Sequence, residues 1–448
     1  MKMQLAHTFR SLTAAALSFA ALSYGTPLRG SDSIPGAPQA GPIALTGGTL
    51  HPVSGPPIEN GVLLMVEGRI AAVGRKVALP EGTRVIDVTG KHVYPALFDA
   101  HTQTGLVEID AVRATRDMQE VGSLNPNVMA HVAVNPDSEL IPVTRANGVL
   151  LNLTAPVGGL ISGQSAVMQL DGWTYEDMTL QPRAAMQLDW PRMSSVRPWW
   201  DDEAEGGEDL EKQRNRQLKE LDDFFDAAAE YTRARAAAPE KRTFDARYEA
   251  MGPALRGEQP LIVQAEELAQ IESAVAFAVR RNLKIILLGG YDASECASLL
   301  KKHDIPVIIP AVYQLPMRPD DPYDTPYTLA ERLRRAGVTF CIGGGGRFSA
   351  SNVRNLPYHA ATAAAYGLPV EEALRAITLS PAEILGVENR VGSLEAGKHA
   401  TLFVASGDPL ETATQVEQAW IQGREVDLTS RHTRLYRKYE EKQRQLGE

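Results

Sequence analysis

A short polar motif follows an apolar run within residues 92–110, HVYPALFDAHTQTGLVEID. Asp99, His101 and Gln103 occupy alternate positions at the end of that run. Alternate residues of a strand share one face, so the three side chains are predicted to point the same way. A histidine in place of Gln103 would complete a typical pair of metal ligands. With glutamine there, His101 is either a lone ligand, a general base or substrate contact, or a buried histidine that is hydrogen-bonded inside the protein.

The elements that would position this motif alternate between strands and helices over residues 96–388. Short apolar runs such as PLIVQAE, LKIILLGG and GVTFCIGGGG end in glycine or polar residues, and helical patterns separate them. Repeated strand–helix units predict a parallel sheet, and their number favours a closed, TIM-like (β/α)8 barrel in an α/β protein. Residues 200–256 interrupt this rhythm. Their charged composition predicts a solvated helical insertion, with a lid or a partner surface as the alternative.

Both flanks of the barrel region are rich in short strands. Residues 42–95 and 389–428 contain alternating apolar runs separated by turn signals, which is typical of antiparallel sheets. Two such segments around a long middle predict a small composite β-sandwich domain built from both chain ends. Residues 429–448 are expected to form a C-terminal helix.

The N-terminus predicts export. Lys2 and Arg10 form a basic start, and the apolar stretch SLTAAALSFAALSYG is too short to span a bilayer, so residues 1–25 are predicted to be a signal peptide. Residues 26–41 look like a flexible mature N-terminus. The protein is therefore expected in the periplasm or another extracytoplasmic compartment, with an uncut membrane anchor as the alternative.

The charge balance restricts the partners. The 448 residues carry a formal net charge of −10, which argues against nucleic acid or an anionic membrane surface as the main partner. Apart from the signal segment, no membrane contact is predicted. A small-molecule ligand is the partner that the composition leaves open.

The stretch DAHTQ, the composite sheet and the terminal segment RVGSLEAGKHATLFV together resemble the amidohydrolase superfamily, most closely its imidazolonepropionase-related branch. The resemblance covers about residues 42–425. It implies a barrel that holds Zn²⁺ or another divalent metal at the carboxyl ends of its strands, where the metal activates water for hydrolysis of amides. The implied ligands are His-x-His on the first strand, Lys or a carboxylate on the fourth, His on the fifth and sixth, and Asp on the eighth.

This chain departs from that pattern at most positions. The matching residues are, in chain order, His101, Gln103, Gln264, Glu266, Gly289 and Gly345. Gly345 stands where the Asp would activate the water and move its proton, which glycine cannot do. No Lys occurs between Lys91 and Lys212, and no His occurs between His131 and His303, so a shifted register does not restore the ligands. We therefore expect no metal and no other cofactor.

The residues that survive predict a polar pocket in place of a metal centre. Its predicted lining is His101, Gln103, Gln264, Glu266 and Arg347. His101 and Glu266 are the main candidates for a catalytic role, with Asp99 or Asp292 as a further member of a reduced site. The alternative for Glu266 is a solvated or salt-bridged carboxylate at a strand end.

The glycine run 343–346 ahead of Arg347 predicts one of two roles. It either cradles an anion through its backbone N–H groups or fills the space left by a missing Asp. Pro357 fits the first turn of a helix, so His359 is expected to begin that helix and to face its packing.

Two functions follow from these residues. The first is an exported amidohydrolase-family protein that lacks most metal ligands and acts as a binding protein or non-catalytic subunit, as a homodimer or paired with an active homologue. The second is a hydrolase of non-peptide carbon–nitrogen bonds, in cyclic or linear amides, with a reduced site. The sequence leaves open whether the protein is an enzyme.

Overall fold

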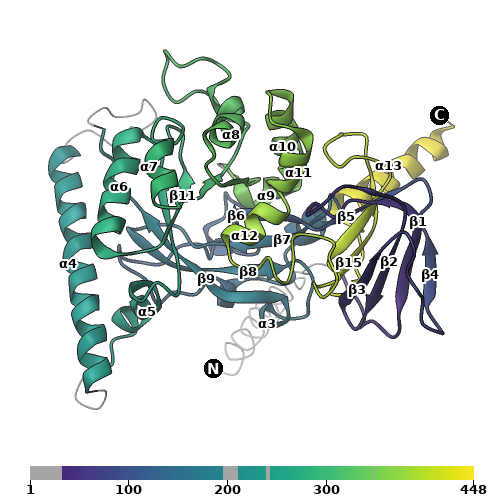
Figure 1. The fold of residues 1–448 in the computed structure, drawn as a ribbon, viewed down its shortest axis with the longest axis horizontal. Coiled ribbons are helices and arrows are strands. Elements are labelled where there is room, and N and C mark those ends of the chain that lie inside the picture. The colour runs from purple at the N-terminus through teal and green to yellow at the C-terminus, as the bar shows by residue number, and fades with distance from the viewer. Residues whose placement is uncertain (1–32, 195–209, 239–242, 347, 448) are drawn as a thin grey trace, which may run out of the picture.

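The computed structural model describes residues 33–194, 210–238, 243–346 and 348–447. A barrel and a second, smaller sheet domain lie side by side (Figure 1). The predicted signal peptide and Arg347 lie outside the described residues. Within the described ranges, no helix combines the length and the apolar character needed to cross a membrane.

Eight strands form the barrel sheet, and neighbours in the sheet are neighbours in the chain. They are β6 (Leu97–Thr102), β7 (Val149–Thr154), β8 (Ile161–Gln169), β9 (Thr179–Asp189), β10 (Leu261–Ala265), β11 (Ile285–Gly289), β12 (Val307–Ile309) and β13 (Phe340–Ile342). The first and last of these strands contact each other, so the barrel is nearly closed. This architecture confirms the predicted barrel.

One strand departs from the predicted parallel sheet. β8 runs antiparallel to both β7 and β9, whereas the other neighbouring pairs are parallel. Only residues 155–160 and 170–178 connect β8 to its neighbours. A parallel crossover needs a dozen or more residues, so connections this short force the chain to turn back.

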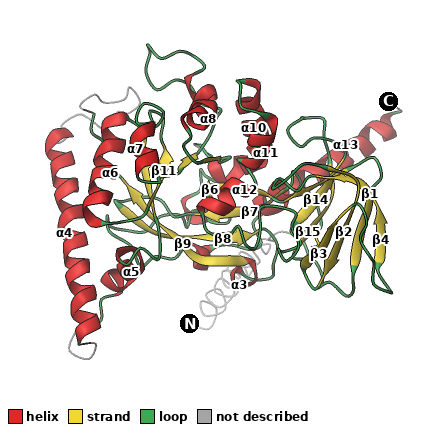
Figure 2. Cartoon of the chain, viewed as in Figure 1, coloured by secondary structure: helices red, strands yellow, loops and turns green. Residues whose placement is uncertain are grey.

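Helices follow the later strands and cover the barrel. They are α2 (Leu140–Arg145), α3 (Tyr175–Met178), α4 (Leu210–Ala237), α5 (Ala246–Leu255), α6 (Leu268–Arg281), α7 (Ala297–Lys302), α8 (Thr325–Ala336), α9 (Ser349–Asn352), α10 (Leu356–Ala365), α11 (Val370–Arg375) and α12 (Leu379–Ile384). Short 3-10 turns occur at η1 (Arg113–Thr115), η2 (Ala130–Ala133) and η4 (Val353–Asn355). Figure 2 shows the helices α6 to α12 gathered on one side of the barrel strands, with β8 and β9 on the other side.

The helices of the insertion pack onto the barrel, which differs from the solvated segment expected there. α4 and α5 both fall within residues 200–256. The side chains that α4 buries in the barrel core recur at helical spacing: Leu221, Phe224, Phe225 and Ala228. Arg281 of α6 fixes the helix further, because its guanidinium binds Asp222 and Asp226 of α4. α4 therefore lies beside α6 at the edge of the barrel (Figure 1).

The second domain is one sheet assembled from both chain ends, as predicted. Its strands are β1 (Ile43–Leu50), β2 (Ile58–Val66), β3 (Arg69–Gly74), β4 (Arg84–Asp87), β5 (His92–Pro95), β14 (Leu402–Ala405), β15 (Val416–Ile421) and β16 (Arg424–Glu425). β14 pairs with β5 and so joins the two chain segments. The sheet has its own core, with Trp420 fully buried in it. α13 (Arg431–Leu446) follows, and Ser430 and Thr433 form a capping box at its start.

Candidate functional site

The motif on the first barrel strand lies at the centre of the candidate site. Asp99 and His101 belong to β6 and are buried, whereas Gln103 follows the strand and is half-buried. The amide oxygen of Gln103 accepts a hydrogen bond from the Ser349 hydroxyl of α9. The helix after the last strand thus holds Gln103 in place.

His101 is a neutral imidazole within the barrel. Burial lowers its pKa to about 4, and a side-chain hydrogen bond with Gln187 of β9 opposes that shift. Gln187 is held in turn, because its Nε2 donates to the Ser165 hydroxyl at 2.9 Å. At neutral pH His101 can therefore donate or accept a hydrogen bond but carries no charge.

Asp99 is a buried carboxyl that ties the first strand to the segment after the last. Its Oδ1 accepts the backbone N–H groups of His101 and Gly344, each at 3.2 Å. Its Oδ2 has no hydrogen-bond partner within the described residues. Burial raises the pKa of Asp99 to about 7, although the two N–H groups oppose the shift.

A second carboxyl stands at the mouth of the barrel, where sequence reasoning missed it. Asp189 ends β9, the fourth barrel strand, and pairs in register with Gln264 of β10. Its side chain is exposed, yet the atoms around it desolvate the carboxyl and raise its pKa to about 6, against the charge of Arg192. A carboxylate is one of the residue types that the family resemblance implies on this strand. The only signal in the sequence is the run AAMQLD, in which an apolar stretch ends in Asp.

The carboxylate of Glu266 fills the space above Gly289, at the ends of β10 and β11. A Cβ atom on Gly289 would overlap that carboxylate. The Tyr291 backbone N–H donates to Glu266 Oε2 at 3.2 Å and fixes its position. Burial raises the pKa of Glu266 to about 7; the Tyr291 N–H lowers it and the nearby charge of Asp292 raises it. Glu266 is thus close to half-protonated at neutral pH.

An ion-pair network fastens the loop 310–324 over this side of the mouth. Arg318 of the loop donates to both carboxylate oxygens of Asp292. Tyr291 donates its hydroxyl to Asp321 Oδ2 at 2.7 Å. The loop between β12 and α8 is therefore bonded to the residues that follow β11.

The glycines after β13 are packed closely against their neighbours. A Cβ atom on Gly345 would lie 2.9 Å from the carbonyl oxygen of Pro310, which is closer than real Cβ atoms approach. A Cβ atom on Gly344 would lie 3.3 Å from the Cβ of Leu356 in α10. The small residues are therefore needed for the closure of the barrel at this point.

Two N–H groups of this glycine run are already used within the protein. Gly344 donates to Asp99, and Gly343 donates to the carbonyl oxygen of Ile309 at 2.8 Å. An anion cradle in this run would lack both donors. Arg347, which was predicted to add charge to the cradle and to line the pocket, lies outside the described residues.

His359 packs within α10, as its position after Pro357 predicts. Its Nδ1 accepts the backbone N–H groups of Val312 and Tyr313, at 3.0 and 3.3 Å. Burial lowers the pKa of His359 to about 4, so the ring is neutral when it accepts these bonds. His359 therefore holds the chain after β12.

The ionisable side chains of the mouth do not converge on one point. Throughout the described ranges, no three His, Cys, Asp or Glu side chains lie close enough together to hold a metal ion. His101, Asp189, Gln264 and Glu266 instead offer separate donors and acceptors. Such a set can hydrogen-bond a polar ligand.

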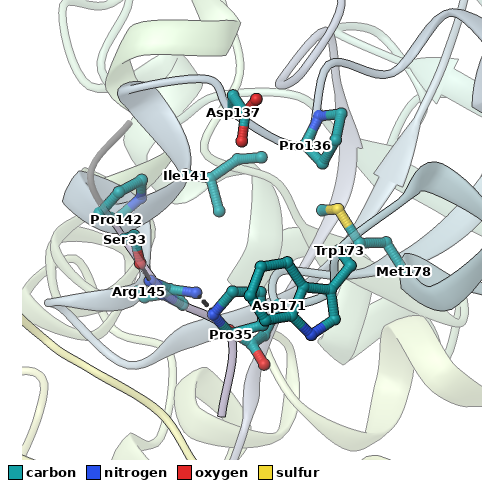
Figure 3. A pocket seen from close by; sticks show the side chains of 11 residues that line it. Ser33, Pro35, Pro136, Asp137, Ile141, Pro142, Arg145, Asp171, Trp173 and Met178 are labelled. Carbon is teal, nitrogen blue, oxygen red and sulfur yellow. Dashed lines mark hydrogen bonds and ion pairs between the residues drawn. The ribbon is translucent and has the colours of Figure 1, made fainter. Parts of the chain in front are cut away.

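A pocket at the opposite end of the barrel surrounds a buried ion pair (Figure 3). Arg145 Nη1 lies 2.7 Å from Asp171 Oδ1, and the two side chains are 3% and 1% exposed. The cavity of about 50 Å³ has room for a few water molecules but not for a substrate. Ser33 accepts from Arg145, and the Gly36 N–H donates to Asp171. The pair therefore binds part of the segment that was predicted to be flexible.

Comparison with known proteins finds amidohydrolases among the similar proteins. A model of the amidohydrolase family matches residues 327–428. The chain is 23% identical to imidazolonepropionase of Rhizorhabdus wittichii over 371 residues, which cover 78% of this chain and 88% of that protein. It is 26% identical to imidazolonepropionase of Symbiobacterium thermophilum over 378 residues, which cover 78% and 84%. The matched segment and these relatives support a relationship to the amidohydrolase superfamily.

Two further proteins extend the comparison. Amidohydrolase tasK of Hapsidospora irregularis is 22% identical over 403 residues; the match covers 82% of this chain but only 39% of tasK. The crystal structure of an amidohydrolase from Thermotoga maritima MSB8 superimposes with a TM-score of 0.76 at 24% identity, covering 86% of this chain and 99% of that one. That likeness confirms the fold of a barrel with a second sheet domain. The chemistry of this chain depends on the residues at its own barrel mouth.

Proposed function

We propose that this amidohydrolase-family protein is exported and binds a small polar ligand at its barrel mouth, without a metal centre and without hydrolysis. One observation carries the proposal. The Glu266 carboxylate occupies the space above Gly289, where the family pattern has a histidine ligand. Because Tyr291 holds that carboxylate, a histidine side chain could enter only if Glu266 moved away.

The remaining side chains at the family's ligand positions support the same reading. Gln103 and Gln264 offer amides, and Gly345 offers no carboxylate to activate a water. Amides hydrogen-bond neutral ligands but do not neutralise a divalent ion. This donor set does not fit a catalytic divalent metal, which usually has three protein ligands.

Metal content tests this proposal directly. Protein purified without chelators should contain much less than one equivalent of zinc, manganese or iron by mass spectrometry. Added Zn²⁺ or Mn²⁺ should not shift the melting temperature, whereas a bound metal at a hundredfold excess over its Kd would stabilise the protein by about 2.7 kcal/mol. One equivalent of metal that disappears in a His101→Ala, Glu266→Ala double variant would overturn the proposal.

Export has its own test. The predicted signal peptide over residues 1–25 supports it, through the basic start and the short apolar stretch. Terminal sequencing of protein from an extracytoplasmic extract should find a chain that begins near residue 26. Recovery of the full-length chain from the cytoplasm alone would contradict export.

A second function is favoured by one feature, the carboxyl of Glu266 with a pKa of about 7. A general base works best when its pKa lies near the working pH. Hydrolysis of a cyclic or linear amide by a reduced site would then require Glu266, with His101 as a substrate contact. Turnover in a panel of such amides that is lost in Glu266→Gln would favour this function over the non-catalytic one.

A further inference from the structure

Two hairpin turns of the composite sheet meet at a cleft outside the barrel. Glu67 and Gly68 connect β2 to β3, and Gln422 and Gly423 connect β15 to β16. All four residues have positive φ, between +48° and +75°, which is typical of two-residue hairpin loops. A Cβ atom on Gly68 would lie 2.9 Å from the carbonyl oxygen of Gln422, so the two turns are in contact.

The N-terminal segment completes the cleft. Gln39 accepts the backbone N–H of Gly68 at 2.8 Å and donates to the carbonyl oxygen of Met65 at 2.8 Å. The cavity between these parts measures about 480 Å³, which is within the range of small-molecule sites. Its lining includes Gln39, Glu67, Arg69, His399, Gln422 and Arg424.

The side chains that line this cleft carry more positive than negative charge. Arg69 donates to the carbonyl oxygen of Gly397 at 2.7 Å, and within the described residues no carboxylate lies in ion-pair distance of its guanidinium. Arg424 is only 3.7 Å from Asp171, whose carboxylate is already bound by Arg145. These cations stand out in a protein whose net charge is −10.

The pKa of His399 is lowered in part by the positive charges of the same cleft. Burial, together with the charges of Arg69 and Arg390, lowers its pKa to about 4. The ring is therefore neutral at pH 7, with Nδ1 3.3 Å from the Gln422 amide nitrogen. His399 and the Gln422 amide thus supply neutral hydrogen-bonding groups beside the guanidinium groups, whereas the Gln39 amide is fully bonded within the protein.

We propose that this cleft binds a small oxyanion, a carboxylate or a phosphate group, through the Arg69 guanidinium. Arg424 adds positive charge, while its Nε and Nη2 donate to the carbonyl oxygens of Ile421 and Asp171. Guanidinium groups match the geometry of both anions and bind them by paired hydrogen bonds. The Gln422 amide, which has one N–H directed to His399, donates its other N–H to a remaining oxygen. Glu67 is the only acidic residue among the described residues that line the cleft, and it weakens the attraction. The site lies in the composite sheet, so it does not depend on whether the barrel binds a metal.

Binding of inorganic phosphate and of succinate, followed by the ³¹P line width and by saturation-transfer NMR at constant ionic strength, tests the site. The intact chain should bind at least one of them saturably at concentrations up to about 10 mM. Binding of phosphate alone would assign a phosphate-bearing ligand, and binding of succinate alone a carboxylate-bearing one. Binding of neither would overturn the proposal.

Three variants make the test specific. Arg69→Gln should weaken binding by a factor of about five or more, since it removes one charge-assisted contact. Glu67→Gln should strengthen binding about two- to threefold, the effect of removing one like charge several ångströms away in water. Arg75→Gln, an exposed residue just beyond the other end of β3, is the matched control and should bind as the intact chain does. Unchanged binding in Arg69→Gln would contradict the site.

Discussion

The carboxylate of Glu266 and the α-carbon of Gly289 are so close that a single added methyl group would overlap the carboxylate. Glu266 follows β10 and Gly289 ends β11, and Ala265, the residue before Glu266, pairs in register with Gly289. The carboxylate therefore takes the volume that a side chain at the end of the sixth barrel strand would use. A larger residue at position 289 therefore requires that Glu266 moves or is replaced.

Gly289→Ala should lower the free energy of unfolding by about 2–4 kcal/mol, measured by urea denaturation. The loss has two parts, strain at a φ of +101° and the overlap with Glu266. Gly386→Ala is the control for strain alone, because its φ is +68° and no atom lies within 4 Å of the new Cβ. Adding Glu266→Ala should recover about 1 kcal/mol of the loss. Equal losses for the two glycines would show that the overlap does not exist in solution.

The buried carboxyl of Asp99 predicts a loss of stability with rising pH. Its pKa of about 7 lies above the value of about 3.9 in an unfolded chain, so the folded protein binds more protons between these values. Stability should fall as the pH rises from about 4 to 7 and then level off, by up to about 4 kcal/mol for this group. Glu266, whose pKa is also raised to about 7, contributes in the same direction.

Asp99→Asn distinguishes the contribution of Asp99 to this pH dependence from that of Glu266. It keeps the oxygen that accepts from His101 and Gly344 but cannot ionise, so the difference in stability between pH 5 and pH 8 should shrink. Asp320→Asn, at an exposed loop position, should leave that difference as it is. Urea denaturation at pH 5 and at pH 8 measures this difference in the free energy of unfolding. A difference unchanged in Asp99→Asn would mean that this carboxyl is not the group that titrates.

The buried pair of Arg145 and Asp171 predicts a large loss when one partner is removed. Arg145→Ala leaves the Asp171 carboxylate buried without that partner, which should cost about 3–5 kcal/mol in the free energy of unfolding. Arg434→Ala removes a pair with Glu139 whose side chains are 39% and 27% exposed, and should cost no more than about 1 kcal/mol. A loss of similar size in both variants would contradict the burial of the first pair.

Arg318 should control the opening of the loop 310–324. Arg318→Ala removes both bonds to Asp292, so amides such as that of Met317, which bonds the Tyr291 hydroxyl, should exchange with deuterium about tenfold faster. Arg375→Ala, which breaks an exposed pair with Glu383 in another part of the barrel, is the control. Exchange at Met317 that is the same in both variants would show that the network does not hold the loop.

The sequence by itself determined which residues stand at the strand ends. The length of an apolar run and the residue that ends it indicate where a buried strand stops. The runs before His101, Gln264 and Gly289 therefore predicted the carboxyl ends of β6, β10 and β11 correctly. The same patterns predicted a composite sheet from both chain ends, which β14 and β5 join. These features depend on local periodicity, which can be recognised from the order of residues alone.

Only the tertiary structure decided how those residues meet. β8 runs antiparallel to its neighbours because its connections are short. The pairing of β9 with β10 then places Asp189 beside Gln264. The apolar stripe of α4 is visible in the sequence, but its packing against the barrel depends on a partner distant in the chain. The contact of Glu266 with Gly289 likewise depends on the register of two strands and on one side-chain rotamer. Such contacts are set by non-local packing, which residue spacing alone does not specify.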